Sequence, residues 1–267
     1  MENIPLIYTA IALSTLAGMS TMLGSILAFM PWRNSARFLA IALGFSAGVM
    51  LYISFVDLLP MGMEHLVEYY GASTGYWRAL ISFFAGILIV ALFDVLIPHC
   101  TGGYGRGKKR HAQCKHSPIF RTGLYACIAL TLHNIPEGFI TLIGTMDNVH
   151  IGIALAIAIA IHNIPEGIAI SIPVFAATGK RRSALFYTFI AGIAEPIGAI
   201  LGIGMLHSCY SGLICGMAFC GVAGMMVYLS LDQMLPTARA QTDPHWAMSG
   251  FVAGMLIMAV SLGLLGA

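Results

Sequence analysis

The stretch IALAIAIAIHNIPEGIAISIPVF, residues 153–175, places the polar motif HNIPEG (162–167) inside a long apolar run. The same six letters occur at 133–138, again within an apolar run. A helix needs about 20 apolar residues to cross a hydrocarbon core of about 30 Å, so both copies lie in segments of membrane-spanning length. An unpaired charged side chain at the membrane centre costs roughly 2.5 to 3.5 kcal/mol. A costly motif that occurs twice indicates that these residues carry the function.

The composition is that of an integral membrane protein. Of 267 residues, 58% are hydrophobic and only 9% are charged, and the mean hydropathy is +0.86. The apolar runs are continuous rather than alternating, which favours an all-α bundle over a β-barrel. We predict one transmembrane domain, residues 1–267, with eight transmembrane helices. Their predicted ranges are 5–30, 38–60, 78–97, 122–145, 151–175, 184–206, 213–235 and 248–267.

The basic residues predict the orientation. Of the 13 Lys and Arg residues, all but Arg78 fall after the first, third, fifth and seventh spans. These alternate loops face the cytoplasm by the positive-inside rule, so both termini are expected to be extracytoplasmic. The longest polar segment, 98–121, becomes a cytoplasmic loop between the third and fourth helices. The net charge of +2 thus reflects topology and gives no reason to expect a nucleic-acid partner.

The chain also repeats itself. GFSAGVMLYISFVDLLP (44–60) matches CGVAGMMVYLSLDQMLP (220–236) at seven of 17 positions. These segments form the second and seventh predicted spans, which cross the membrane in opposite directions, as do the fourth and fifth spans with HNIPEG. Small residues recur in any membrane bundle, but an identical HNIPEG pair favours an inverted repeat of 3+2+3 helices. Inverted repeats with a site near the midplane are typical of secondary transporters.

Helical geometry predicts how the motif is used. With about 100° per residue, and His133 set at zero, Asn134 lies near 100° and Glu137 near 40°. The carboxylate therefore lies between its two neighbours, where it can bridge two cations or pass one cation between two positions. The second copy has the same geometry with His162, Asn163 and Glu166.

Proline at the fourth position of the motif adds a backbone effect. Pro136 and Pro165 lack an N–H, and their rings clash with the carbonyl four residues earlier. We therefore expect each helix to kink, giving a broken-helix binding site. Gly138 and Gly167 permit close approach of another backbone or of a hydrated ion.

A third acidic group completes the cluster. Glu195, in AEPIG (194–198), lies near the middle of the sixth span. Three buried carboxylates repel one another unless a cation neutralises them, which predicts a divalent metal site. Imidazole, amide and carboxylate together suit Zn²⁺, Fe²⁺, Mn²⁺ or Co²⁺ better than Mg²⁺ or Ca²⁺.

The two HNIPEG copies, the eight spans and AEPIG resemble the ZIP family of divalent metal transporters, in its bacterial broad-range branch. The resemblance covers essentially the whole chain. It implies uptake of Zn²⁺, with Fe²⁺, Mn²⁺, Co²⁺ and Cd²⁺ as further candidates, into the cytosol across the plasma (bacterial inner) membrane, with no prosthetic group and no enzymatic activity. It further implies a homodimer and a two-metal centre on the fourth and fifth helices.

The family's ligands carry over by position. One metal position would use His133, Glu137, His162 and Glu166. The adjacent position would use Asn134, Asn163 and Glu195, with the same two glutamates bridging. Some relatives have glutamine at the place of His162 or acidic residues at those of the asparagines, so the metal preference stays open.

Weaker signals lie outside the motifs. Asp57, near the outer end of the second span, and Asp232, near the inner end of the seventh, are candidates for metal entrance and exit; helix-end polarity explains them equally well. Asp94 is expected to be an inner-boundary residue. The cytoplasmic loop carries possible soft ligands at His99, Cys100, His111, Cys114 and His116. The predicted outer loops carry Glu64, His65, Glu68 and His150.

Two other classes of function stay open at this point. An intramembrane metallohydrolase would use a metal-activated water, although the sequence has no His-Glu-x-x-His helix. A metal-free proton channel would use the same histidines. For a transporter, alternating access, proton-linked exchange and channel-like flow are all compatible with the sequence.

Overall fold

The computed structural model describes residues 4–30, 35–96, 118–208 and 212–265. Within these ranges all regular secondary structure is helical. The helices are α1 (Ile4–Ala28), α2 (Ala36–Ile53), η2 (Ser54–Leu58), α3 (Leu59–Tyr70), α4 (Ala72–Leu96), α5 (Pro118–Asp147), α6 (Val149–Thr178), α7 (Arg181–Ser208), α8 (Gly212–Leu229), η3 (Ser230–Met234), α9 (Leu235–Gln241) and α10 (Pro244–Leu265). The two η segments are π-helical turns that join α2 to α3 and α8 to α9.

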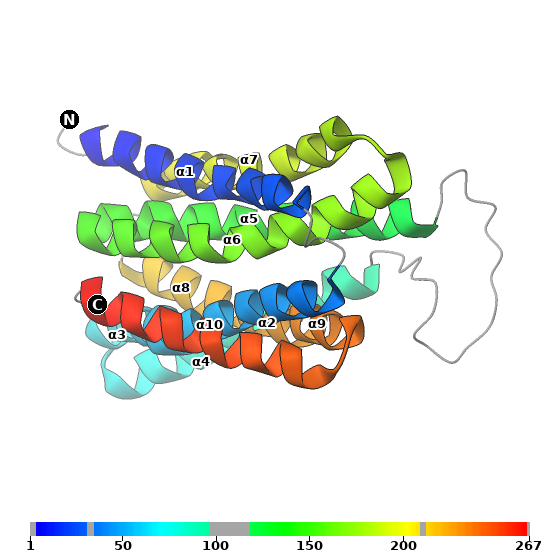
Figure 1. Ribbon diagram of the computed structural model, residues 1–267. Helices are drawn as coiled ribbons and strands as arrows, with labels where there is room; N and C mark the ends of the chain where they lie inside the picture. The colour runs from blue at the N-terminus through cyan, green and yellow to red at the C-terminus, as the bar shows by residue number, and fades with distance from the viewer. Residues whose placement is uncertain (1–3, 31–34, 97–117, 209–211, 266–267) are drawn as a thin grey trace.

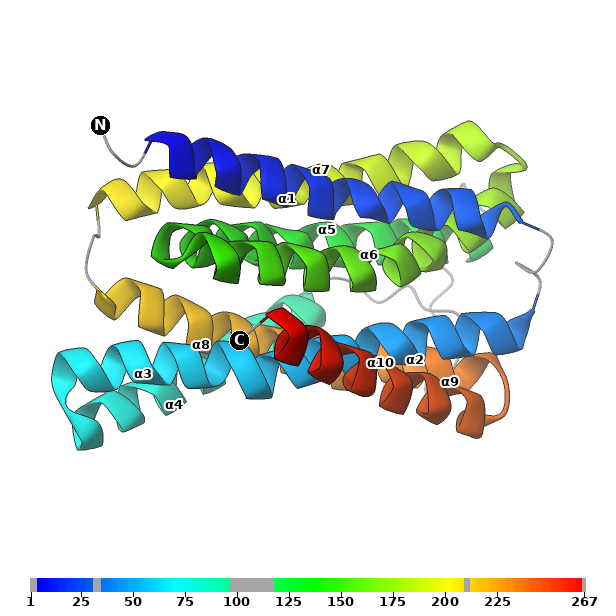
Figure 2. The same ribbon diagram turned by 60° about the vertical axis from the view of Figure 1, so that its left-hand side comes forward.

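The helices are arranged in two layers, which Figures 1 and 2 show one above the other. In one layer α1 packs on α6 and α7, and α5 packs on α6 and α7. In the other, α2 packs on α10, and α8 packs on α3 and α4. Contacts of α2 with α6 and of α5 with α8 join the two layers. The HNIPEG helices, α5 and α6, therefore lie at the boundary between them.

Seven helical segments of the described chain are long and apolar enough to cross a membrane. Two of them are composite: Ala36–Tyr70 contains α2, η2 and α3, and Leu213–Gln241 contains most of α8 with η3 and α9. Helix α5, which holds the first HNIPEG copy, is not among the seven, although its 30 residues match α6 in length. The prediction of an all-α membrane protein is confirmed.

The composite helices correct two predicted boundaries. The second span is predicted to cover 38–60, but the helix continues through Pro60 to Tyr70, so Glu64, His65 and Glu68 lie on α3 rather than in a loop. The physical reason is the π-turn: Leu59 N–H bonds to the Ser54 carbonyl five residues back, and Pro60 falls in the first turn of α3, where no N–H is needed. The same arrangement carries the seventh span through Pro236 to Gln241.

The HNIPEG helices differ from the prediction in a related way. Both α5 and α6 continue without interruption through Pro136 and Pro165, so neither is a broken helix. A change in helix direction at these prolines stays a prediction. At its start, α5 begins at Pro118, inside the segment 98–121 that was predicted to be a loop.

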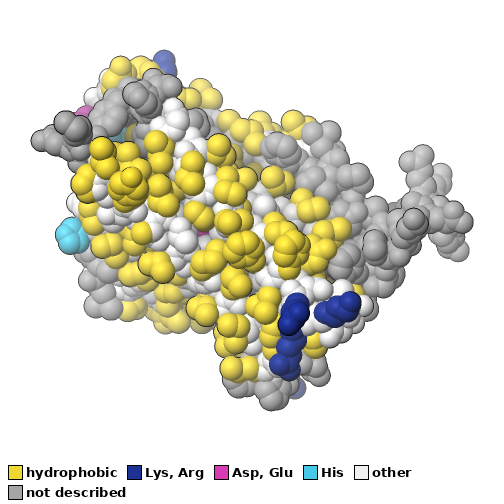
Figure 3. Space-filling model, turned by 90° about the horizontal axis from the view of Figure 1, so that it is seen from above, with side chains coloured by type: hydrophobic (Ala, Val, Ile, Leu, Met, Phe, Trp, Pro, Cys, Tyr) yellow, Lys and Arg dark blue, Asp and Glu magenta, His cyan; other side chains and the backbone are white. Residues whose placement is uncertain are grey.

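The outer surface is mainly apolar. Figure 3 shows hydrophobic side chains over most of one face, with a group of Lys and Arg side chains at one end. The large exposed residues include Leu16 on α1, Leu88 on α4 and Leu256 on α10. An apolar surface of this kind suits a lipid environment. The helices also satisfy their own backbone polar groups, as the interior of a lipid bilayer requires.

Candidate metal centre

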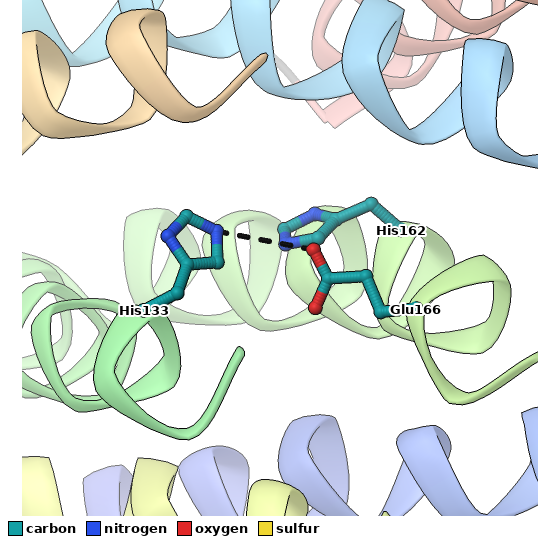
Figure 4. A group of neighbouring side chains, drawn as sticks. All are labelled: His133, His162 and Glu166. Atoms are coloured by element: carbon teal, nitrogen blue, oxygen red, sulfur yellow. Dashed lines mark ion pairs between the residues drawn. The ribbon is translucent and has the colours of Figure 1, made fainter. Parts of the chain in front are cut away.

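Helices α5 and α6 bring the two HNIPEG copies together. Both histidines, both asparagines and both glutamates are buried, as is Glu195 from α7, and none of these seven side chains is more than 4% exposed. Figure 4 shows His133 reaching from α5 toward His162 and Glu166 of α6. One polar cluster thus receives side chains from three helices of one layer.

Glu137 lies between the two imidazoles. Its Oε1 atom is 2.9 Å from Nε2 of His133 and 2.9 Å from Nε2 of His162. These are hydrogen-bond distances; ligand atoms about 2.0–2.1 Å from one tetrahedral Zn²⁺ lie about 3.3–3.4 Å apart, so a small widening of this group would hold a shared metal. The angular argument from the sequence placed Glu137 beside His133, and the structure adds His162 from the facing helix.

A backbone contact orients one of the two rings. The Nδ1 atom of His162 lies 3.1 Å from the Ala158 carbonyl oxygen. Because a carbonyl only accepts, Nδ1 must donate, and Nε2 then faces Oε1 of Glu137 at 2.9 Å. In the neutral ring the Nε2 lone pair is available to a metal ion placed between these two groups. The Ser46 hydroxyl of α2 donates to the His162 carbonyl (3.3 Å) and so ties this turn of α6 to the other layer.

Glu166 completes the histidine side of the cluster. Its Oε1 atom is 3.9 Å from His133 Nε2. Ligand atoms of His133, His162 and Glu166 all lie within 4.8 Å of one another, which is compatible with a common cation (Figure 4). Nitrogen and oxygen donors of this kind suit divalent ions of the Zn²⁺ type.

The asparagines form the other side of the cluster, and the backbone orients both. Nδ2 of Asn134 donates to the Ala191 carbonyl on α7 (2.9 Å), and Nδ2 of Asn163 donates to the Ala17 carbonyl on α1 (3.1 Å). Asn163 Nδ2 also donates to Glu195 Oε1. Because the nitrogens are engaged, the Oδ1 atoms are left as possible ligands.

Unpartnered polar atoms are concentrated in this cluster. Ten buried side-chain N and O atoms of the described residues lack a well-aligned hydrogen bond, and seven belong to the predicted ligands. Six are oxygens, namely Asn134 Oδ1, Glu137 Oε2, Asn163 Oδ1, both Glu166 oxygens and Glu195 Oε2, and the seventh is His133 Nε2, which still contacts Glu137 Oε1 at 2.9 Å. Buried polar groups are normally paired, because leaving one unpaired costs about 1–3 kcal/mol. A cation would satisfy most of these atoms at once.

The weaker candidates lie elsewhere. Asp57 is partly exposed within η2 and Asp232 is exposed within η3, so both lie inside composite helices rather than at span ends as predicted. No described contact joins either one to the cluster. His150 is exposed in the first turn of α6, and the side chain of Asp94, in α4, is outside the described residues. The loop ligands His99, Cys100, His111, Cys114 and His116 also lie outside them.

Sequence reasoning did not find the residues that hold the ligands in place. The groups that do so are the hydroxyl of Ser46 and the backbone carbonyls of Ala17, Ala158 and Ala191. Hydroxyls and backbone carbonyls occur throughout the chain. No sequence signal distinguishes these alanines, because their role depends on which helices cross.

The fold and the cluster define a multi-pass helical membrane protein with buried ionisable groups, the arrangement found along ion and substrate pathways. The profile of the family described as "ZIP Zinc transporter" matches residues 106–262. The Zinc transporter ZupT of Clostridium perfringens is 40% identical, over 98% of this chain and 97% of that protein. Those of Oceanobacillus iheyensis (43%; 99% and 100%) and Campylobacter jejuni (40%; 97% and 97%) are similarly close. The chain belongs to the ZIP family, whose members are transporters rather than enzymes.

Proposed function

We propose that this protein takes up divalent metal ions, Zn²⁺ at the least, into the cytosol through the cluster on α5, α6 and α7. The observation that carries the proposal is the set of six buried, unpartnered oxygen atoms of Asn134, Glu137, Asn163, Glu166 and Glu195 in the interior. The relatives named zinc transporters, which match nearly the whole chain, support zinc as cargo. Imidazole and carboxylate ligands also suit Fe²⁺, Mn²⁺, Co²⁺ and Cd²⁺.

The proposed centre holds two metal positions that share Glu137 and Glu166. The histidine position takes its other ligands from His133 and His162, and the short distances from Glu137 to both rings support it. The asparagine position adds the two Oδ1 atoms and Glu195. The free second oxygen of each shared glutamate allows a carboxylate to bridge the two ions.

An eight-span, 3+2+3 inverted repeat is the proposed topology, with α5 as the eighth span. Helix packing supports it, because contacts occur in matched pairs: α1 on α6 matches α7 on α5, α2 on α10 matches α8 on α4, and α3 on α8 matches α9 on α2. The two π-turns match as well, since each begins at a serine and is followed by Leu-Pro.

The proposed location is the inner membrane of a bacterial cell. The proposed orientation places the basic ends of the helices on the cytoplasmic side of that membrane. Both termini lie at one end of the molecule, and the turn between α6 and α7, which carries Lys180, lies at the other (Figure 1). In this orientation Asp57 would serve the entrance and Asp232 the exit. A homodimer stays an expectation from family resemblance.

Cysteine labelling tests this orientation. In a chain whose six cysteines are replaced by serine, Lys180→Cys is expected to react with a membrane-impermeant maleimide only after the cells are permeabilised. Ser73→Cys, exposed at the start of α4, is expected to react in intact cells. Reaction of both positions, or of position 180 alone, in intact cells would contradict the orientation.

Uptake by proteoliposomes tests the function. Liposomes with the protein are expected to accumulate radioactive Zn²⁺ faster than empty ones, and Glu166→Ala is expected to lower this rate at least about tenfold, because a buried ligand is lost. A competition series with Fe²⁺, Mn²⁺, Co²⁺ and Cd²⁺ ranks the cargo ions. Uptake no faster than in empty liposomes for all five metals would refute the proposal.

A further inference from the structure

Thr21, in the middle of α1, behaves unlike other threonines of the bundle. A helical threonine commonly donates its hydroxyl to the carbonyl four residues earlier, and eight threonines of the described helices do so. They are Thr9, Thr15, Thr131, Thr141, Thr145, Thr178, Thr188 and Thr237. The Thr21 hydroxyl is fully buried and has no partner. The carbonyl it would use, that of Ala17, instead accepts from Ser20 and from Asn163.

The backbone contacts around the cluster show what Thr21 corresponds to. Helices α1 and α7 cross at Gly18 and Gly192, where a Cβ on either glycine would overlap the carbonyl oxygen of the other. Three residues beyond these glycines lie Thr21 and Glu195, respectively. A Cβ on Gly167 would overlap the Thr21 carbonyl, and a Cβ on Gly138 would overlap the Glu195 carbonyl.

The asparagine contacts follow the same correspondence. Asn163 donates to Ala17, one residue before Gly18, and Asn134 donates to Ala191, one residue before Gly192. The residue number on α1 differs from that of its counterpart on α7 by the same amount in every one of these pairs: Ala17 with Ala191, Gly18 with Gly192, and Thr21 with Glu195. Thr21 is therefore the counterpart of Glu195, on the opposite helix.

We infer that the Thr21 hydroxyl is a further ligand of the asparagine position, on the side opposite Glu195. This inference rests on the proposed function and identifies a residue that tunes its metal preference. Glu195 pairs with Asn163, and the counterpart of that pair is Thr21 with Asn134, whose Oδ1 is also buried and unpartnered. One helix contributes a carboxylate, and its counterpart contributes a neutral oxygen.

The chemistry of a hydroxyl gives this asymmetry a consequence. A second carboxylate at Thr21 would add a fourth negative charge beside Glu137, Glu166 and Glu195, and would raise both the affinity for a dication and the cost of releasing it. A neutral hydroxyl supplies a hard oxygen without that charge. Hard oxygen ligands favour Mn²⁺ more than the softer Cd²⁺, so Thr21 should influence selectivity between these ions.

Metal binding by purified variants tests the inference. Equilibrium dialysis with Zn²⁺ is expected to show two ions per chain in the unmodified protein, with the weaker one bound about five- to tenfold less tightly in Thr21→Val, which removes the hydroxyl and keeps the shape. In Thr21→Val, the ability of Mn²⁺ to displace bound Zn²⁺ should fall more than the ability of Cd²⁺ to do so. Thr21→Ser, which keeps a hydroxyl, is expected to retain most of the affinity.

Thr15→Val is the matched control, because Thr15 lies on the same helix and its hydroxyl bonds to the Ile11 carbonyl. It should bind both ions like the unmodified protein. If Thr21→Val matches the unmodified protein in both affinities and in competition, or if Thr21→Ser loses as much as Thr21→Val, the inference is wrong. Failure of the Thr21 inference does not by itself decide the proposed function. Zn²⁺ uptake by the unmodified protein would still support the proposed function, and absence of that uptake would refute it.

Discussion

Glu137→Gln is expected to lower zinc uptake by two to three orders of magnitude, the largest effect of any single substitution in the cluster. Oε1 of Glu137 contacts Nε2 of both His133 and His162 at 2.9 Å, and the side chain is 1% exposed. Removing one partner of a buried ionic contact costs about 3–5 kcal/mol, and each 1.4 kcal/mol is about tenfold. Glutamine keeps the shape of the side chain, removes its charge and replaces one acceptor oxygen with an NH₂ donor.

The measurement is radioactive Zn²⁺ uptake at a concentration well below saturation, with equal amounts of folded protein in each liposome preparation. Glu68→Gln is the matched control, because Glu68 is exposed on α3 and has no described contact with the cluster. Its uptake should stay within about twofold of the unmodified rate, as expected for surface substitutions. A Glu137→Gln protein that folds normally and retains a tenth of the uptake would show that Glu137 is not a shared ligand.

The position of Glu137 could be predicted because it depends on local geometry. Helical spacing alone placed its carboxylate beside His133 and Asn134, and the identical second motif indicated a partner helix. The length of the second span could not be predicted in the same way. Pro60 ordinarily ends a helix, and only the π-turn before it, which the sequence does not reveal, lets the helix continue to Tyr70.

The groups that hold the ligands were also beyond prediction, for a different reason. The carbonyls of Ala17 and Ala191 orient the two asparagines, but which carbonyl lies beside which amide depends on how α1 and α7 cross. Buried hydroxyls such as Thr21 give no signal in one sequence, because most helical threonines bond to their own helix. Their distinctive contacts appear only once the helices are packed.

Gly18→Ala is expected to lower the stability of the folded bundle strongly, because it adds a methyl group where α1 crosses the backbone of α7. The new Cβ would overlap the Gly192 carbonyl oxygen and would lie 3.2 Å from the Glu195 Cβ. Backbone cannot rotate away as a side chain can, so the helices must separate, at a cost of about 3 kcal/mol. The midpoint of thermal unfolding in detergent should fall by roughly 6–12 °C.

Two further variants make this prediction specific. Gly263→Ala, on α10 with no atom within 4 Å of the added Cβ, should change the free energy of unfolding by less than about 1 kcal/mol. Gly192→Ala should be as harmful as Gly18→Ala, because the two glycines contact each other's carbonyls. The double variant should lose less than the sum of the single losses, since separating the helices once relieves both overlaps. Fully additive losses would show that the two overlaps are not relieved by one separation. A Gly18→Ala midpoint equal to that of Gly263→Ala would show that α1 and α7 do not depend on this crossing.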